Sequence, residues 1–376
     1  MKVPLSGPWI TEDDIKAVEK VMRTSYLSLG PKLPEFEEKL ANVADRKYAV
    51  AVNSGTSALH LIIRSLGISK GDEVITTPFS FIASSNSILF EGAKPVFVDI
   101  RKDTYNINPD LIERAITERT KAILAVDVFG QPADWDEIIR IAKRYNLYLI
   151  EDSAEAIGSI YKNKSAGSFG DAAIFAFYPN KQITTGEGGA VLTDNEKIAT
   201  LSRSMRNQGR GEGDTWLEHT RLGYNYRISD INCALGISQL SRLNEIIEKR
   251  NKVAQIYSNK LKDIEEIMVP YISAKVTRMS WFVYVIRLSD KFGRNDRNFI
   301  IDSLRKKGVQ TRNYFSPIHL QPFYIDLFGY KRGDFPVTEY VSDRTISLPF
   351  YTTISEDEIN FVVKSLKEVL FEMRKR

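Results

Sequence analysis

The sequence predicts an α/β fold, in which a mostly parallel sheet is covered by helices and followed by a smaller α+β domain. In the first 200 residues, short β-branched runs alternate with segments whose apolar residues recur at helical spacing. Several runs are apolar throughout, which is typical of strands buried on both faces. We expect seven strands, at residues 48–52, 73–77, 95–99, 121–127, 147–151, 172–177 and 190–193.

Helices are expected between the strands, for example at 134–145, and before them, where Thr11 begins a capping-box pattern with aspartate in place of glutamate. From residue 229 to about 264 the apolar residues keep a helical period, which predicts a long connecting helix, whole or broken. A strand at 281–288, a helix at 297–306 and a final helix that begins near Ser355 follow. We therefore divide the chain into a large domain, 1–250, and a small domain, 251–376.

Composition narrows the function classes. The 376 residues include 52 basic and 48 acidic side chains, and the resulting net charge of +4 does not argue for nucleic-acid binding. Cys233 is the only cysteine, which excludes an intrachain disulfide and fits a reducing compartment, and three scattered histidines do not form a zinc motif. No apolar run approaches the roughly 18 residues that span a bilayer, and the start resembles no signal peptide. We expect a cytoplasmic protein without metal, membrane or nucleic-acid partners.

Polar and aromatic residues follow the first two strands, at the sheet edge where open α/β sheets bind ligands. Ser54, Gly55 and Thr56 lead from the first strand into a helical segment. The N–H groups at such a helix start suit a phosphate, although a serine there is also an ordinary helix cap. Phe81 follows the second strand, where its ring would either stack on a flat ligand or fill the core.

Two charged residues follow later strands. Asp152 ends the fifth strand, and a carboxylate at a buried strand end needs either a cation, such as a protonated pyridine nitrogen, or a helix to cap. Lys181 follows the sixth strand, after aromatic residues and Pro179 and before a turn rich in threonine and glycine. A partly buried lysine in this position can attack an aldehyde. The sequence therefore favours Lys181 as a nucleophile over an ordinary surface lysine.

Four ordered segments resemble those of the DegT/DnrJ/EryC1/StrS sugar aminotransferases. They are Ser-Gly-Thr-Ser-Ala-Leu at 54–59, Glu-Asp-Ser-Ala-Glu-Ala-Ile-Gly at 151–158, Phe-Tyr-Pro-Asn-Lys followed by Thr-Thr-Gly-Glu-Gly-Gly at 177–189, and Gly-Tyr-Asn-Tyr-Arg at 223–227. The two Gly-Pro pairs near the start and the segment 317–322 are similar as well, so the resemblance covers essentially the whole chain. It implies the type I fold of pyridoxal-phosphate (PLP) enzymes, with a large, mainly parallel, seven-stranded sheet domain.

The resemblance also implies roles for individual residues. Lys181 would carry pyridoxal 5'-phosphate as a Schiff base, and Asp152 would pair with its pyridine nitrogen. Phe81 would stack on the ring, and Gly55 and Thr56 would bind the phosphate.

Further roles come from the same resemblance. Asn225 is similar to a residue that reaches the phosphate from the neighbouring subunit, which implies a homodimer with shared sites. Glu155 is a further expected cofactor contact, and His319 and Tyr314 are expected at the substrate. Two positions depart from the common pattern: Ala176 replaces a phosphate-binding serine, and Glu155 replaces a glutamine, as in perosamine-synthase-like relatives.

The implied reaction moves an amino group from L-glutamate to a nucleotide-linked ketosugar. The loop 184–189 is similar to that of relatives that aminate C4 of 4-keto-6-deoxyhexoses, so we expect a 4-amino sugar for surface polysaccharide, linked to GDP, UDP or dTDP. Alternatives are a 3-ketosugar or cyclitol aminotransferase, a dehydratase, which would have histidine at Lys181, and a non-enzymatic regulator, although no DNA-binding segment is evident. Residues 206–214 form either a flap over the sugar or an ordinary loop.

Overall fold

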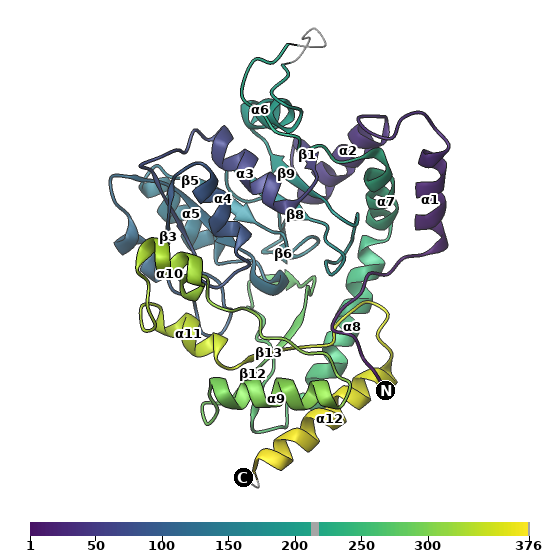
Figure 1. The fold of residues 1–376 in the computed structure, drawn as a ribbon, viewed down its shortest axis with the longest axis vertical. Coiled ribbons are helices and arrows are strands. Elements are labelled where there is room, and N and C mark those ends of the chain that lie inside the picture. The colour runs from purple at the N-terminus through teal and green to yellow at the C-terminus, as the bar shows by residue number, and fades with distance from the viewer. Residues whose placement is uncertain (212–217, 375–376) are drawn as a thin grey trace.

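Seven strands form one sheet, which confirms the predicted architecture (Figure 1). In this computed structural model, which describes residues 1–211 and 218–374, the strand order is β1-β9-β8-β5-β4-β2-β3. The strands from β8 to β3 pair in parallel, and β9 is antiparallel to both of its neighbours. The bounds are β1 Tyr48–Val52, β2 Glu73–Thr76, β3 Lys94–Phe97, β4 Thr120–Val126, β5 Tyr148–Asp152, β8 Ala172–Ala176 and β9 Gly189–Thr193.

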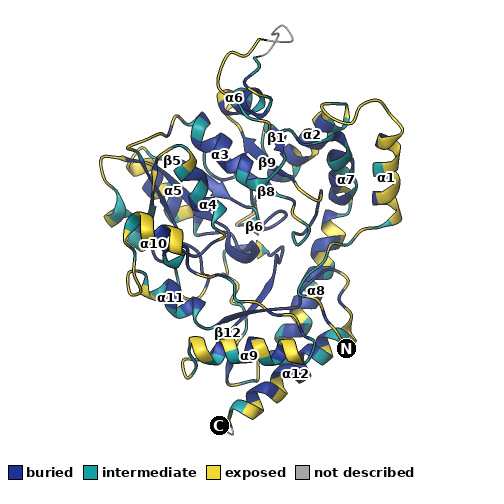
Figure 2. Ribbon diagram, viewed as in Figure 1, coloured by how far each residue is buried: buried dark blue, intermediate teal, exposed yellow. Residues whose placement is uncertain are grey.

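Helices cover both faces of this sheet, because alternate strand residues point to opposite faces and both sets are apolar. Val50 and Val52 pack with α3, α4 and α6, whereas Ala49 and Ala51 face the side of α2, α7 and α8. Figure 2 shows the central strands buried and the outer sides of helices such as α1 exposed. The bounds are α1 Glu12–Met22, α2 Lys32–Ala44, α3 Gly55–Ser65, α4 Ala83–Phe90, α5 Trp135–Arg144, α6 Glu196–Arg206, α7 Asp230–Ser241 and α8 Leu243–Leu261.

The predicted connecting helix is two helices, α7 and α8, separated at Arg242, whose backbone leaves the helical region. Beyond α8 lies a three-stranded sheet, β10-β12-β13, flanked by α9 and α12. Since α8 runs through residue 250 without a break, the domain boundary there stays a prediction. The bounds are β10 Ile267–Met268, β12 Tyr284–Leu288, β13 Thr345–Leu348, α9 Arg294–Lys306, α10 Pro322–Phe328, α11 Pro336–Ser342 and α12 Glu356–Arg374.

A third, small sheet joins the two halves of the chain. Its strand β11 (Val276–Arg278) pairs with β6 (Ile160–Tyr161), which in turn pairs with β7 (Lys164–Ser165). Short 3-10 turns lie at Pro109–Leu111, Glu113–Ala115, Val128–Gly130 and Ile318–Leu320.

Both helix starts expected from their caps are present. The Glu358 side chain accepts a hydrogen bond from the N–H of Ser355 at 2.8 Å, and the Ser355 hydroxyl accepts one from the N–H of Glu358 at 3.2 Å. Thr11 and Asp14 form the corresponding contact at α1, where the N–H of Thr11 donates to the carboxylate at 2.9 Å. Asp14 therefore plays the same capping role at α1 as Glu358 plays at α12.

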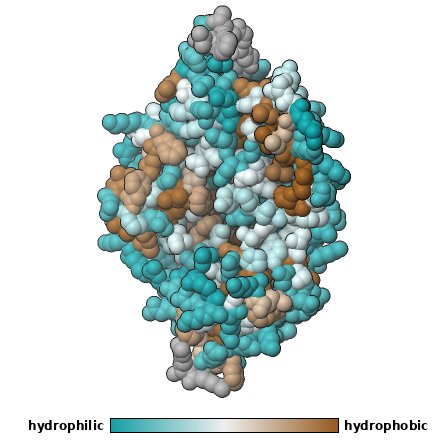
Figure 3. All heavy atoms as spheres, turned by 45° about the vertical axis from the view of Figure 1, so that its right-hand side comes forward, coloured by the Kyte–Doolittle hydropathy of each residue, from teal (hydrophilic) through white to brown (hydrophobic). Residues whose placement is uncertain are grey.

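The surface is mixed in character. Figure 3 shows apolar side chains in several separate groups among hydrophilic ones on the face that it presents. Within residues 1–211 and 218–374, no helix combines the length and the apolar content that crossing a membrane requires. Of the segment 206–214, residues 212–214 lie outside the described part of the chain.

Candidate active site

The segments that follow β1, β2, β5 and β8 meet around one cavity of about 470 Å³. It lies at the carboxyl ends of the parallel strands, where open α/β sheets bind their ligands. The predicted site residues that line it are Gly55, Thr56, Phe81, Asp152, Glu155, Lys181 and Tyr314. Residues far apart in the sequence are thus brought together as the strand order requires.

Lys181 lies in the connection between β8 and β9. This connection is closed by hydrogen bonds, since the N–H of Phe177 donates to Gly188 O at 2.9 Å and the N–H of Thr185 donates to Phe177 O at 3.0 Å. The Lys181 side chain is only 12% exposed. Its Nζ lies 3.5 Å from Oε1 of Glu155, so the amine is held inside the cavity rather than in solvent.

Asp152 ends β5 and is buried. The Ser84 hydroxyl donates to its Oδ2 at 2.7 Å, and the N–H of Ala154 donates to Oδ1 at 3.2 Å. Burial raises the pKa of Asp152, while the Ser84 hydrogen bond and the charge of Lys181 lower it. A cation placed in the cavity would stabilise the charged form of this buried carboxylate. The protonated nitrogen of a pyridine ring is such a cation.

The turn before α3 forms another wall of the cavity. The N–H of Ser57 donates to the Ser54 hydroxyl at 3.1 Å, so Ser54 caps the helix. The N–H groups of Gly55 and Thr56 take no partner from the described residues, and both residues line the cavity. Ser54 therefore acts as a cap, and the turn still offers free donors and a positive helix end to a phosphate.

The close packing of this turn against β8 explains why residue 55 is a glycine. A Cβ on Gly55 would lie 2.8 Å from the Cβ of Ala176, which is closer than two such carbons can approach. Ala176 lines the cavity beside the turn but offers no hydroxyl. Any phosphate here is held without the donor that a serine at this position would add.

Glu155 is buried next to Lys181. Its Oε2 accepts a hydrogen bond from the N–H of Phe129 at 2.9 Å, and its backbone oxygen accepts one from the Gln182 amide. Burial raises the pKa of Glu155, and the nearby charge of Lys181 opposes that rise. Its carboxylate can therefore exchange a proton with the lysine more readily than an exposed glutamate can.

Two aromatic residues border the cavity as predicted. Phe81 keeps 63% of its surface exposed, so its ring is free to stack on a flat ligand and does not serve the core. Burial, with the charge of Glu155 as a second cause, raises the pKa of Tyr314 to about 12. Tyr314 is thus a neutral hydrogen-bonding group at neutral pH.

Two predicted residues do not line the cavity. His319 is fully buried elsewhere, where its Nε2 lies 3.0 Å from Oε1 of Glu339 and its ring packs edge-on against Phe335. Burial lowers its pKa. The structure therefore does not bring His319 to this cavity, and its role at the substrate stays a prediction. Asn225 is exposed at the surface, and its backbone oxygen accepts a hydrogen bond from the Asn53 side chain at 3.3 Å.

Sequence reasoning missed several lining residues. Ser84 follows Phe81 by three positions, in the first turn of α4, so its place near the cavity could have been inferred. Phe282 falls within the strand expected at 281–288, but the strand begins at Tyr284, because Trp281 has a left-handed backbone with φ 53°. The other lining residues to which no role was assigned from the sequence include Tyr178, Asn180, Glu187 and Phe315.

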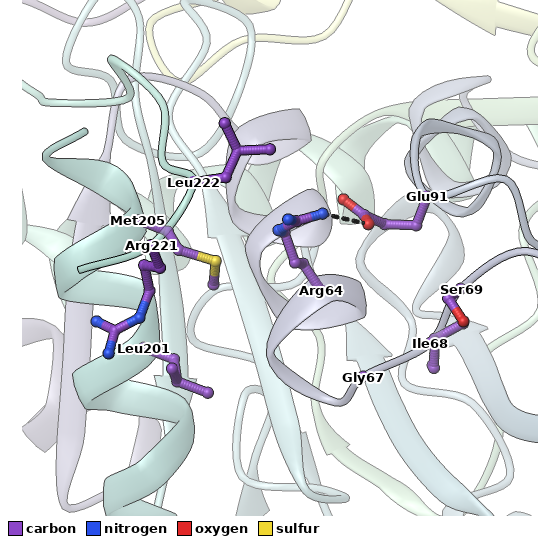
Figure 4. A pocket seen from close by; sticks show the side chains of 9 residues that line it. All are labelled: Arg64, Gly67, Ile68, Ser69, Glu91, Leu201, Met205, Arg221 and Leu222. Atoms are coloured by element: carbon purple, nitrogen blue, oxygen red, sulfur yellow. Dashed lines mark hydrogen bonds and ion pairs between the residues drawn. The ribbon is translucent and has the colours of Figure 1, made fainter. Parts of the chain in front are cut away.

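A second hollow of about 290 Å³ lies between α3, α6 and residues 221–222 (Figure 4). Arg64 and Glu91 form an ion pair in it, with 2.6 Å between Nη1 and Oε2, and Met205 and Leu222 provide apolar walls. It contains none of the predicted site residues. The chemistry is therefore assigned to the larger cavity.

Comparisons with known proteins identify one family. The model of the DegT/DnrJ/EryC1/StrS aminotransferase family matches residues 8–367. The GDP-perosamine synthase of Caulobacter vibrioides is 35% identical, over 98% of each chain. PseC of Helicobacter pylori, an aminotransferase involved in the biosynthesis of pseudoaminic acid, has a similar structure, with a TM-score of 0.93, 31% identity and coverage of 99% of this chain and 100% of that one.

The PLP-form of a putative sugar aminotransferase from Streptococcus pneumoniae superposes equally well, with a TM-score of 0.93, 29% identity and coverage of 99% of each chain. Because the family model and these relatives span nearly the whole chain, the chain belongs to the DegT/DnrJ/EryC1/StrS aminotransferase family and is a PLP-dependent sugar aminotransferase.

Proposed function

We propose that the enzyme transfers the amino group of L-glutamate to C4 of a nucleotide-linked 4-keto-6-deoxyhexose, in the synthesis of an amino sugar for a surface polysaccharide. The observation that carries the chemistry is the meeting of Lys181, Asp152 and Glu155 in one cavity. The choice of C4 is supported by the loop 184–189 and by the 35% identity with a GDP-perosamine synthase.

Different cavity residues are proposed to hold different parts of the cofactor. We assign Lys181 as its covalent anchor, Asp152 as the partner of the pyridine nitrogen and the N–H groups of Gly55 and Thr56 as ligands of the phosphate. When bound, pyridoxal phosphate supplies an aldehyde carbon and a ring that accepts electrons. Phe81 lies at the cavity, where its ring can cover one face of a flat ligand.

Lys181 also moves the proton once an amino donor has displaced it. Its Nζ removes a proton from the α-carbon of the donor and returns one to the cofactor side, as general base and then general acid. Glu155, 3.5 Å away, balances the positive charge while Nζ holds the proton. Ser84 fixes the direction of the Asp152 carboxylate through its hydrogen bond of 2.7 Å.

We also propose a cytoplasmic homodimer in which each subunit completes the site of the other. The charged residues that line the cavity are three carboxylates, Asp152, Glu155 and Glu187, and one cation, Lys181. A cofactor phosphate and a nucleoside diphosphate are anionic, so further donors must come from outside this lining. Asn225 is exposed and free to reach a neighbouring subunit.

The test is a panel of nucleotide-linked ketosugars offered with L-glutamate and scored by the mass of the product. We expect amination of 4-keto-6-deoxyhexoses and formation of 2-oxoglutarate in equal amounts. Reaction of only 3-ketosugars or cyclitols would overturn the C4 assignment and leave the family reaction intact. As a control, the purified protein should be yellow, and Lys181→Ala prepared without added amine should be colourless.

A further inference from the structure

The ammonium group of Lys181 lies against an aromatic ring that no motif of the sequence singled out. Its Nζ is 3.9 Å from the centre of the Phe282 ring and 3.5 Å from the Glu155 carboxylate. Phe282 is only 2% exposed, so water does not weaken the contact. A cation on the face of a buried ring is attracted by the ring's negative face, and more strongly than at an exposed site.

The backbone that carries the ring is held by a buried arginine. The Nη2 of Arg250 donates to Phe282 O and its Nε donates to Trp281 O, each at 2.7 Å. A third bond of 3.2 Å reaches the Thr352 hydroxyl. Arg250 is 2% exposed, and burial lowers its pKa to about 9, so its charge is maintained by these oxygens at neutral pH.

One residue ties the ring to the carboxylate. The N–H of Phe129 donates to Glu155 Oε2 at 2.9 Å, and its carbonyl accepts the N–H of Phe282 at 3.2 Å. The next residue, Gly130, has φ +94°, and a Cβ there would lie 3.0 Å from Glu155 O and 3.2 Å from Phe282 N. Carboxylate and ring are therefore held at a fixed separation by the same turn.

We propose that Phe282 is a positioning residue for Lys181, whose ammonium group it holds together with Glu155, and that Arg250 positions Phe282. This inference rests on the proposed role of Lys181 as proton carrier. The ring favours the stage at which Nζ has taken up the proton, and in this role it acts through Lys181. Its loss should therefore lower kcat and leave KM for both substrates nearly unchanged.

The first test measures Lys181 itself in the full-length enzyme loaded with pyridoxamine phosphate, the form in which the lysine is free. Reductive methylation with formaldehyde and cyanoborohydride is followed at the Lys181 peptide by mass. Phe282→Leu removes the ring but keeps apolar bulk, so the freed amine should react about tenfold faster. Phe282→Tyr keeps the aromatic face and should stay within about twofold of the unsubstituted enzyme.

The second test measures turnover with an α-deuterated amino donor. In Phe282→Leu we expect kcat to fall about tenfold and the deuterium isotope effect to rise, because proton removal then limits the rate. Phe169→Leu is the matched control, since Phe169 is equally buried but stacks on Trp135, at 5.0 Å between ring centres, away from the cavity. It should change thermal stability but neither the methylation rate nor the isotope effect.

Two results would overturn the inference. One is an equal methylation rate and isotope effect in Phe282→Leu and the unsubstituted enzyme, with Lys181 still trapped by borohydride in the yellow form. The other is a Phe282→Tyr variant as impaired as Phe282→Leu. If borohydride traps the cofactor on a residue other than Lys181, the proposed function itself fails, and this inference fails with it.

Discussion

The Nζ of Lys181 and Oε1 of Glu155 lie 3.5 Å apart, and the two side chains are only 12% and 7% exposed. At this distance the carboxylate can balance the ammonium charge and accept its proton, which an amide cannot do. The glutamate therefore gives this enzyme a second proton-binding group beside its lysine.

Glu155→Gln tests that role. The amide oxygen can still accept the hydrogen bond from Phe129, so the fold should be kept, whereas kcat should fall about tenfold. Because burial raises the pKa of Glu155, the carboxyl group loses its proton at a higher pH than an ordinary glutamate. Activity should therefore decline on the acidic side in the original enzyme, and that limb should be missing from the pH profile of kcat in the variant. An unchanged acidic limb would contradict the prediction.

Asp127→Asn tests a buried carboxyl pair behind the site. The Ser153 hydroxyl lies 2.6 Å from Oδ2 of Asp127 and 2.6 Å from Oε1 of Glu151. Its single proton cannot serve both groups, and burial, with the charge of Glu151 as the next cause, raises the pKa of Asp127. The folded chain then binds a proton more tightly than the unfolded chain does.

The sign of the pH dependence follows from linkage. As pH rises from about 3.9, the ordinary aspartate value, towards the raised folded value, the unfolded state loses its proton first and stability falls. Asparagine has no such proton, so this decline should become smaller in urea unfolding curves measured across pH, while the part due to Glu151, Asp152 and Glu155 remains. Asp326→Asn, at an exposed position of α10, is the control and should keep the decline.

Gly130→Ala tests the turn that joins Glu155 to Phe282. The substitution combines left-handed strain at φ +94° with contacts at 3.0 and 3.2 Å, so we expect a loss of about 1–3 kcal/mol in the free energy of unfolding and a lower kcat. Gly67→Ala, at φ +73° with open space around it, carries the strain alone and should lose stability without losing kcat. Equal kcat losses in both variants would remove the turn from the mechanism.

Ala176→Ser tests the reduced phosphate site. A hydroxyl beside the start of α3 should add one hydrogen bond to the cofactor phosphate and tighten binding about threefold to tenfold. Equilibrium dialysis of pyridoxamine phosphate measures this without turnover, and unfolding of the unloaded proteins shows whether the fold is altered. No gain in affinity would mean that other donors already saturate the phosphate.

Mixed dimers test the shared sites. Lys181→Ala and Asn225→Ala should each be inactive or nearly so alone. In a mixed dimer one site keeps both residues, so coexpression of the two variants should restore about a quarter of the original activity if subunits pair at random. A mixture that remains inactive would show that Asn225 serves its own subunit, and an Asn225→Ala variant that is active alone would show that it serves neither site.

The sequence predicts the sheet well because buried parallel strands are apolar throughout, and all seven lie within two residues of their expected positions. Asp152 ends one strand and Lys181 follows the neighbouring strand, so the strand order alone places both residues at one edge of the sheet. Phe282 could not be found this way, because it reaches the cavity through packing between distant segments, and Arg250 contacts only its backbone oxygen. His319 lies in a recognisable motif, but a motif does not give side-chain direction, and Glu339 holds the ring in the interior.

The antiparallel placement of β9 sets how Lys181 can move. Its loop is tied into the sheet at both ends and closed by the bonds of Phe177 to Gly188 and Thr185. The backbone therefore stays in place while the lysine exchanges one task for another, and only its side-chain torsions turn. The proposed change of Lys181 from anchor to proton carrier therefore needs side-chain rotation alone, and no loop has to open for it.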